Sequence, residues 1–268
     1  MDTWELIQNW NYVLPPSRPS VEQLKNILAI GKSLDHNAPV AILGSTPEFR
    51  DLLFEAGFRS IFVFDKFDNF YDAMSKLRIY DNEELVVKGD WLESLSGFKN
   101  YFSLILSDLT SGNLSYDSRA AFYSFIADAL APNGIFYDKV LTHNEHNIRF
   151  QDLVSKYSQL PLNLLFINYY SSEMLFCSDL LDINQTVDTS LFYSIIYERV
   201  TNRRVLSFTD QAKLKITPEN CIWYYGRKWA DLKKEYCPKL ELLSEYIEDN
   251  NSNPYYGRLR FFTMQKKY

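Results

Sequence analysis

The sequence predicts an α/β protein built on a doubly wound, mostly parallel sheet, with an N-terminal arm and an inserted helical cap. Short apolar runs alternate with amphipathic segments from Pro39 to Leu141, and this alternation stops at Thr142. Runs that are apolar throughout are typical of strands buried on both faces. Alternating strands and helices favour parallel pairing, with helices on both faces of the sheet. These two observations define the predicted core.

The elements of the core follow from their own patterns. The run VAILG at residues 40–44 is apolar throughout. The segment 47–57 repeats apolar residues at helical spacing and ends at Gly57, a favoured helix terminator. The same criteria predict strands at 60–65, 84–90, 101–108 and 134–141, and helices at 69–80 and 118–134.

Two flanking regions and a final unit complete the expected organisation. The stretch LPPSRPS at residues 14–20 contains three prolines, which predict a stiff extended arm, and Ser20 is a candidate N-cap of a helix at 21–34. After Thr142 the pattern becomes mostly helical and rich in Phe and Tyr. A short strand at 221–226, one long helix at 229–248 and a strand at 258–264 then follow. We therefore divide the chain into an arm and helix (1–36), a core (37–142), a helical cap insertion (143–217) and a C-terminal helix and strand pair completing the sheet (218–268).

Composition restricts the class of function. The chain has 268 residues, of which 46% are hydrophobic and 16% aromatic, and a net charge of −6 without a long basic run. This charge makes nucleic acid an unlikely partner, and no apolar run reaches membrane-spanning length. No signal peptide is read, and three widely spaced cysteines suit a reducing, cytoplasmic compartment and give no metal-binding spacing. The aromatic surplus favours a pocket for a small, flat or apolar molecule.

The turn after the first strand carries unusual chemistry. Gly44 allows a tight turn, Thr46 can cap the next helix, Pro47 suits its first position and Glu48 lies in its first turn. A helix N-terminus attracts anions, so a phosphate would bind well there. Because Glu48 brings its own carboxylate, the turn argues against a pyrophosphate cofactor such as NAD. It suits a cofactor without phosphate, whose amino group needs an acceptor.

Acids follow each of the next three strands. Asp65 comes about 20 residues after Gly44, the spacing expected for an acid that binds ribose hydroxyls. Gly89, Asp90 and Trp91 end the third strand, and Ser107, Asp108 and Leu109 end the fourth. The carboxyl ends of parallel strands lie at one sheet edge, where ligands bind in open α/β sheets.

In order and spacing, ILGSTPE, FVFD, VVKGDW, LILSDL and APNGIF resemble the motifs of class I S-adenosylmethionine-dependent methyltransferases, in the branch whose first motif reads G-x-T-P-E. The resemblance covers about 100 residues and implies a Rossmann-like methyltransferase sheet that binds S-adenosylmethionine. It also implies roles for individual residues. Gly44, Ser45 and Thr46 would pass close to the methionine and ribose parts of the cofactor. Asp65 would bind the ribose hydroxyls, with Lys66 and Phe67 beside the adenosine. Asp90 and Trp91 would contact the adenine, and Asp108 and Leu109 would lie near the sulfonium.

Several residues keep an ordinary alternative. Asp90 and Asp108 can be helix and turn caps. Arg18 can pack within the arm, the favoured interpretation, or pair with the methionine carboxylate or a substrate acid. His143 and His146 lack a third metal ligand, so no metal is expected, but His143 can act as a general base. The base, where one is needed, is Asp108, His143 or a tyrosine of the cap.

The predicted function is methyl transfer from S-adenosylmethionine to an O, N or C nucleophile of a small or medium-sized molecule. Two alternatives stay open. One is an aminopropyl transferase on the same core. The other is a non-catalytic binding or partner protein, which the atypical first motif favours because Thr46 and Glu48 stand at the usual glycine positions. The sequence does not indicate the methyl acceptor or the oligomeric state.

Overall fold

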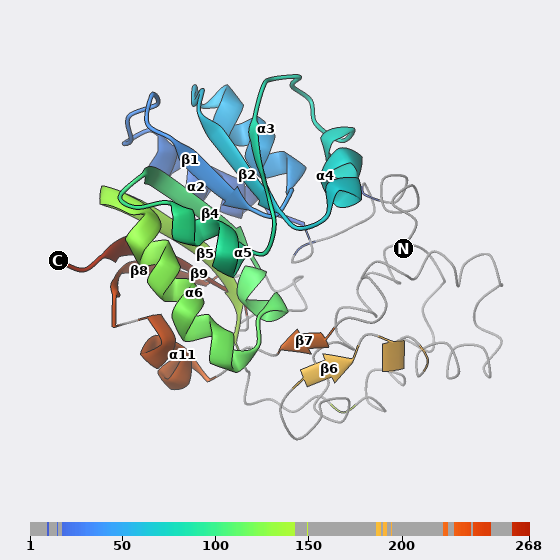
Figure 1. The fold of residues 1–268 in the computed structure, drawn as a ribbon, viewed down its shortest axis with the longest axis vertical. Helices are drawn as coiled ribbons and strands as arrows, with labels where there is room; N and C mark the ends of the chain where they lie inside the picture. The colour runs from blue at the N-terminus through green and yellow to red at the C-terminus, as the bar shows by residue number, and fades with distance from the viewer. Residues whose placement is uncertain are drawn as a thin grey trace.

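The computed structural model describes most of the predicted core and several segments on either side of it (Figure 1). The described residues are 10, 15, 18–142, 149, 186–188, 190, 191, 194, 222–224, 228–236, 238–247 and 259–268. Most of the expected cap (143–217), including His143, therefore lies outside the described residues. The proposed domain boundaries stay a prediction.

A seven-stranded sheet forms the centre, in the order β3-β2-β1-β4-β5-β9-β8. The first five strands in sequence are parallel, whereas β9 runs antiparallel to both β5 and β8. The prediction of a doubly wound, mostly parallel sheet is thus confirmed. The strands are β1 (Val40–Leu43), β2 (Ile61–Asp65), β3 (Leu85–Lys88), β4 (Phe102–Asp108), β5 (Leu130–Leu141), β8 (Leu240–Ile247) and β9 (Leu259–Lys266).

Helices cover both faces of this sheet. The helical elements are α2 (Val21–Gly31), α3 (Pro47–Glu55), α4 (Asp68–Ser75), α5 (Trp91–Ser94), η2 (Leu95–Gly97), η3 (Thr110–Asn113), α6 (Tyr116–Ala129) and α11 (Trp229–Tyr236). Helices α2 and α3 pack on one face, and α6 and α11 pack on the other, where Figure 1 shows them together. Ser20 caps α2 as predicted, because its hydroxyl accepts a hydrogen bond from the Gln23 N–H at 3.0 Å.

Two apolar clusters, one on each face, explain why the strands are apolar throughout. Along β1, Val40 and Ile42 face the α2–α3 side, while Ala41 and Leu43 face the α6 side. All four side chains are buried. Burying a side chain the size of Val40, Ile42 or Leu43 contributes roughly 1.5–3 kcal/mol, so a strand buried on both faces stabilises two layers at once.

The expected helix at 229–248 is wrong in its second half. Helix α11 ends at Tyr236, and residues 240–247 form strand β8. Pro238 explains the break, since a proline removes a helical hydrogen bond and clashes with the preceding turn. A register shift between Leu242 and Ser244 explains the misleading pattern. Leu240 and Leu242 face one cluster and Tyr246 the other, so the spacing imitates a helix.

The strand expected at 221–226 exists, but not in the main sheet. Strand β7 (Ile222–Tyr224) pairs antiparallel with β6 (Thr186–Asp188), so the main sheet is completed by β8 and β9 instead. Strand β6 also lies inside the region expected to be mostly helical. This small sheet contacts the core, because Val187 is buried in the α2–α3 cluster and Trp223 packs against it.

The largest differences from the predicted boundaries of the core concern α4, α6 and β5. Helix α4 ends at Ser75 rather than Tyr80, and α6 ends at Ala129 rather than Gly134. Strand β5 begins at Leu130, where it already pairs with Phe102 of β4, before a bulge realigns the two strands. No described helix has both the length and the apolar character needed to cross a membrane.

Candidate functional site

The strand register brings the predicted site residues to one edge of the sheet. Leu43 pairs with both Phe64 and Ser107, so the residues that follow them, Gly44, Asp65 and Asp108, lie at the same level. Lys88 pairs with Asp65 and Lys139 with Asp108, which extends this level over five parallel strands. The level includes the gap between β1 and β4, where the strand order reverses and ligands bind in such sheets.

Gly44 forms an open turn at the end of β1. Its φ of +99° is a left-handed conformation that other residues adopt only with strain. A Cβ at this position would meet no atom within 4 Å, so the turn faces open space. The Gly44 N–H donates to the Phe64 carbonyl at 2.8 Å, which fixes the turn against β2.

Glu48, in the first turn of α3, is held by the N-terminal arm. One carboxylate oxygen, Oε1, accepts hydrogen bonds from the Trp10 indole at 2.9 Å and from Arg18 at 2.5 Å. The other oxygen, Oε2, is buried and has no hydrogen-bond partner among the described residues. Trp10 also packs against Met74. Arg18 therefore contacts the protein itself, and its role toward a methionine carboxylate or a substrate acid stays a prediction.

Thr46 occupies the N-cap position of α3, as predicted, but its hydroxyl does not cap the helix. It lies instead 3.5 Å from Oδ2 of Asp108. The side chain thus spans the gap between the end of β1 and the end of β4. Because the capping hydrogen bond is not made, the first N–H groups of α3 keep their donor capacity at this edge.

Asp65, at the end of β2, is buried and already ordered. Its Oδ2 accepts from the Ser45 hydroxyl, and its Oδ1 accepts from the Phe67 N–H at 3.0 Å. Burial raises the pKa of this carboxyl, while the hydrogen bonds from Ser45 and from the Phe67 and Lys66 N–H groups act in the opposite direction. Each oxygen of a carboxylate can accept more than one hydrogen bond, so capacity is left for a ligand hydroxyl.

Asp90 and Trp91 both have structural roles. Asp90 is the N-cap of α5 and accepts from the Leu92 N–H at 3.0 Å, and Lys66 lies 3.6 Å from its other oxygen. The Trp91 indole N–H donates to the Phe64 carbonyl at 3.2 Å. The capping interpretation of Asp90 is therefore correct, although 40% of its side chain is exposed and can still meet a ligand.

Other residues around β2 and β3 differ in exposure. Gly89 adopts a φ of +134° between β3 and α5, and its N–H donates to the Asp65 carbonyl at 3.2 Å. Phe67 is 61% exposed, a large value for an aromatic side chain beside a buried acid. An exposed ring at this edge offers a face for stacking on a flat group.

Asp108 lies in contact with a buried lysine. Its Oδ1 forms an ion pair with the ammonium of Lys139, whose side chain is fully buried, and 9% of the Asp108 side chain is exposed. Leu109 follows with a φ of +60°, a left-handed conformation that costs a non-glycine residue about 1–3 kcal/mol. The Leu109 N–H donates to the Lys139 carbonyl at 3.0 Å, which holds this turn.

Ser107 points to the opposite face of the sheet. Its hydroxyl donates to Asp138 at 2.6 Å, and the Tyr123 hydroxyl donates to the other oxygen of Asp138 at 3.1 Å. Burial raises the pKa of Asp138 to about 7 and raises the pKa of Tyr123 well above its usual value. The Ser107 side chain therefore belongs to a buried network under α6.

Sequence reasoning missed Asp138 and Lys139. Both lie inside the apolar run GIFYDKVL, and both are fully buried. The available signal was the pair itself, because two adjacent charges in an otherwise buried strand must each find a partner on opposite faces. The partners, Ser107 and Asp108, are adjacent residues of the neighbouring strand.

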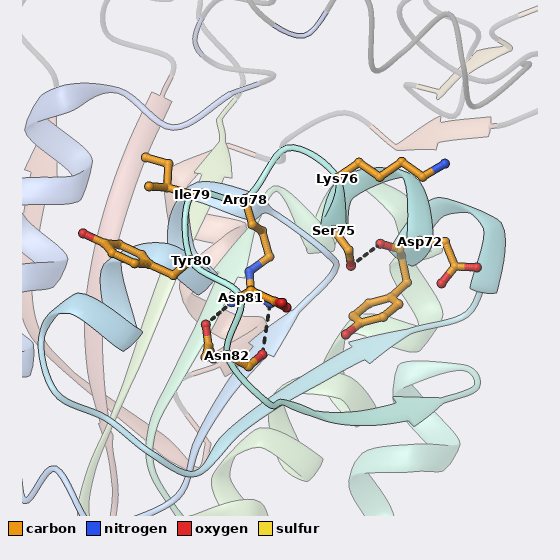
Figure 2. A pocket seen from close by; sticks show the side chains of 9 residues that line it. Asp72, Ser75, Lys76, Arg78, Ile79, Tyr80, Asp81 and Asn82 are labelled. Carbon is orange, nitrogen blue, oxygen red and sulfur yellow. Dashed lines mark hydrogen bonds between the residues drawn. The ribbon is translucent and has the colours of Figure 1, made fainter.

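A separate pocket lies away from this edge (Figure 2). It has a volume of about 630 Å³ and is lined by residues of α4 and the following loop, none of them a predicted site residue. That loop leads into the amino end of β3, so the pocket lies toward the amino ends of the strands, whereas the candidate site lies at their carboxyl ends. Figure 2 shows Arg78 hydrogen-bonded to Asn82, while Lys76 extends away from them.

Behind this loop, Arg50 and Glu84 form a fully buried ion pair at 2.6 Å. Arg78 lies 3.2 Å from the same Glu84 carboxylate. In the described part of the chain, no three His, Cys, Asp or Glu side chains gather as metal ligands.

The chain is similar in fold to proteins of known structure. No family model and no curated protein matches the sequence. Among solved structures, a protein described as a zinc-dependent alcohol dehydrogenase from Rhodobacter sphaeroides is similar over 99% of this chain and 97% of its own, with a TM-score of 0.63 and 12% identity.

Two methyltransferases solved with S-adenosylhomocysteine are also similar. The N-methyltransferase NodS from Bradyrhizobium japonicum matches over 100% of both chains, with a TM-score of 0.56 and 9% identity. The magnesium protoporphyrin IX methyltransferase of Synechocystis matches over 99% of this chain and 93% of its own, with a TM-score of 0.52 and 10% identity. At such low identity, and with two different activities among these descriptions, the likeness defines the architecture and leaves the chemistry to the site. The chain therefore has the Rossmann-like methyltransferase fold.

Proposed function

We propose that this protein binds S-adenosylmethionine and transfers its methyl group to an O, N or C nucleophile of a small or medium-sized molecule. The observation that carries the proposal is the single sheet edge at which Gly44, Asp65, Asp90 and Asp108 stand at or just after the ends of four consecutive strands. The proposal includes a cytoplasmic location, which rests on the cysteine pattern of the sequence. It does not include a metal.

The residues at this edge suit such a cofactor. The open space beside Gly44 leaves room for a ligand to approach the backbone closely. The buried Oε2 of Glu48 is an acceptor without a described partner, and it matches the ammonium group of a methionine moiety. Asp65 keeps acceptor capacity for ribose hydroxyls, and the exposed ring of Phe67 is available to an adenine. A pyrophosphate would instead meet the carboxylate of Glu48.

The cofactor supplies a methyl group already activated on a cationic sulfur. The protein therefore needs mainly to align the acceptor with that methyl group and to exclude water. Asp108 is the acid at the switch point, and its ion pair with Lys139 fixes the orientation of its carboxylate. If the acceptor must lose a proton, the predicted candidates are Asp108, His143 and the tyrosines of the cap, of which only Asp108 lies within the described residues.

Isothermal titration with S-adenosylmethionine and with S-adenosylhomocysteine tests the proposal. We expect micromolar binding of both compounds by the wild-type protein. Asp65→Ala should weaken both by roughly a hundredfold, because two hydrogen bonds to a buried carboxylate are lost. Asp72→Ala removes an exposed acid on α4 and serves as the matched control, with unchanged affinity. Failure of folded wild-type protein to bind either compound would refute the proposal.

One observation favours a second candidate, a non-catalytic partner protein on the same fold. Trp10 and Arg18 already engage Glu48, so the arm occupies part of the first turn of α3. Under this alternative the arm stays in place and neither compound binds. Affinity capture of partners would then replace the search for a methyl acceptor. An aminopropyl transferase would instead bind decarboxylated S-adenosylmethionine more tightly than the parent compound, which the same titration measures.

A further inference from the structure

Lys139 is a buried cation at the candidate site. Its side chain is fully buried on β5, and its ammonium contacts Oδ1 of Asp108, its register partner on β4. The second oxygen of Asp108 lies 3.5 Å from the Thr46 hydroxyl at the end of β1. A chain of side chains therefore runs across the gap between β1 and β4, where the strand order reverses.

The cost of this arrangement indicates that it is not incidental. Removing an ammonium group from water is unfavourable unless a carboxylate and further hydrogen bonds compensate it. An apolar side chain would fill the same place in the strand at a lower desolvation cost, as its neighbour Leu141 does on this face. The ion pair also sets the local charge, because a carboxylate and an ammonium group in contact have a net charge of zero at this edge of the sheet.

The other carboxylates near Asp108 have contacts of their own. Arg18 compensates Glu48 on the side of α3. Asp138 lies on the opposite face of the sheet, within its own network. Asp65 is ordered by Ser45, whose hydroxyl is uncharged. Among the described residues, Lys139 is the cation that forms an ion pair with Asp108 at the end of β4.

We propose that Lys139 is a positioning residue that neutralises Asp108 and so limits how strongly the site favours a cationic sulfur over a neutral one. This inference rests on the proposed function. A methyl donor is cationic at sulfur, and the product is neutral, so positive charge fades in the transition state. A bare carboxylate would stabilise the bound donor more than the transition state, which slows transfer. With Lys139 in contact, Asp108 stays a hydrogen-bond acceptor of fixed orientation, and its negative charge no longer stabilises the bound donor more than the transition state.

The ratio of two dissociation constants tests the inference directly. S-adenosylmethionine and S-adenosylhomocysteine differ at the sulfur by one methyl group and one charge. Isothermal titration of both compounds, at one pH and salt concentration, gives the ratio for the wild type, Lys139→Met, Lys139→Arg and the double variant Lys139→Met/Asp108→Asn. Thermal unfolding of each variant shows that it is folded.

We expect Lys139→Met to shift the ratio roughly tenfold toward the cationic compound, the size that one added unit charge gives across a partly buried site. Lys139→Arg should keep the wild-type ratio because it keeps the charge. The double variant should restore the ratio because it removes both charges. If Lys139→Met does not fold, Asp108→Asn replaces it and should shift the ratio in the opposite direction, since it removes the negative charge of Asp108 and keeps the positive charge of Lys139.

An unchanged ratio in the folded variants, with both affinities lowered equally, would overturn the inference and leave Lys139 as a structural residue. Failure of the proposed function looks different, because the wild type itself would then bind neither compound.

Discussion

Asp138→Asn is expected to remove a pH dependence from the stability of the fold. Asp138 is fully buried on β5, between the hydroxyls of Ser107 and Tyr123. Asparagine has nearly the same shape and can satisfy both neighbours, accepting from one hydroxyl and donating to the other. The substitution therefore removes the titrating group while the packing under α6 stays in place.

The magnitude follows from the pKa of Asp138, which burial raises from 3.8 to about 7. The folded chain binds this proton more tightly than the unfolded chain, so the stability it contributes is complete below about pH 4 and is lost as the pH rises through about 7. At about 1.4 kcal/mol per pH unit, the whole effect is roughly 4 kcal/mol. About 2.5 kcal/mol of it falls between pH 5 and pH 8.

Urea unfolding of the wild type and of Asp138→Asn at pH 5, 6, 7 and 8 measures this effect. The difference between the two free energies of unfolding should shift by about 2.5 kcal/mol in favour of the variant as the pH rises from 5 to 8. All other titrating groups are common to both proteins and cancel in the difference. Parallel curves for the two proteins across this range would refute the reasoning.

Two further predictions concern buried charge and backbone strain. Glu84→Gln should lower the free energy of unfolding by about 3–5 kcal/mol, because it removes the carboxylate that pairs with the buried Arg50 and with Arg78. Urea unfolding measures this loss. Gly44→Ala should cost about 1–3 kcal/mol, since φ is +99° at this position, and should also weaken binding of S-adenosylhomocysteine because the new methyl group enters the open space at the turn.

Each of these substitutions has a matched control in the same chain. Glu83→Gln changes the exposed neighbour of Glu84 and should cost less than about 0.5 kcal/mol. Equal losses at positions 83 and 84 would contradict the role of the buried pair. Gly97→Ala adds a methyl group at an exposed glycine outside the left-handed region. If the binding affinity falls as much for Gly97→Ala as for Gly44→Ala, the turn after β1 is not part of the ligand site.

The core was predictable because its signals are local. Continuous apolar runs predict buried strands, and an acid at the end of each run predicts polar groups at one edge, a placement that the strand register confirms for Asp65 and Asp108. The contacts of these residues were not predictable. The partners of Glu48 lie 38 and 30 residues away in the sequence, and Lys139 reaches Asp108 only through strand pairing. Local patterns do not encode such distant pairings.

The secondary-structure predictions were wrong where one local sequence pattern fits two different structures. The bulge in β8 gave a strand the spacing of a helix, and only its pairing with β9 decides between them. Similarly, the apolar run at 222–224 has the composition of a sheet strand, but its partner lies at 186–188 rather than in the main sheet.

The place of β9 in the sheet has a consequence for how the chain assembles. β9 lies between β5 and β8 and supplies the hydrogen bonds that join them, although β8 precedes it in the sequence. During synthesis β8 leaves the ribosome before β9. Until β9 has been made, the backbone N–H and C=O groups of β8 cannot form their hydrogen bonds within the sheet. We therefore expect β8 and β9 to join the sheet together and late in folding, and we expect β8 to be exposed to pairing with a wrong strand until β9 is available.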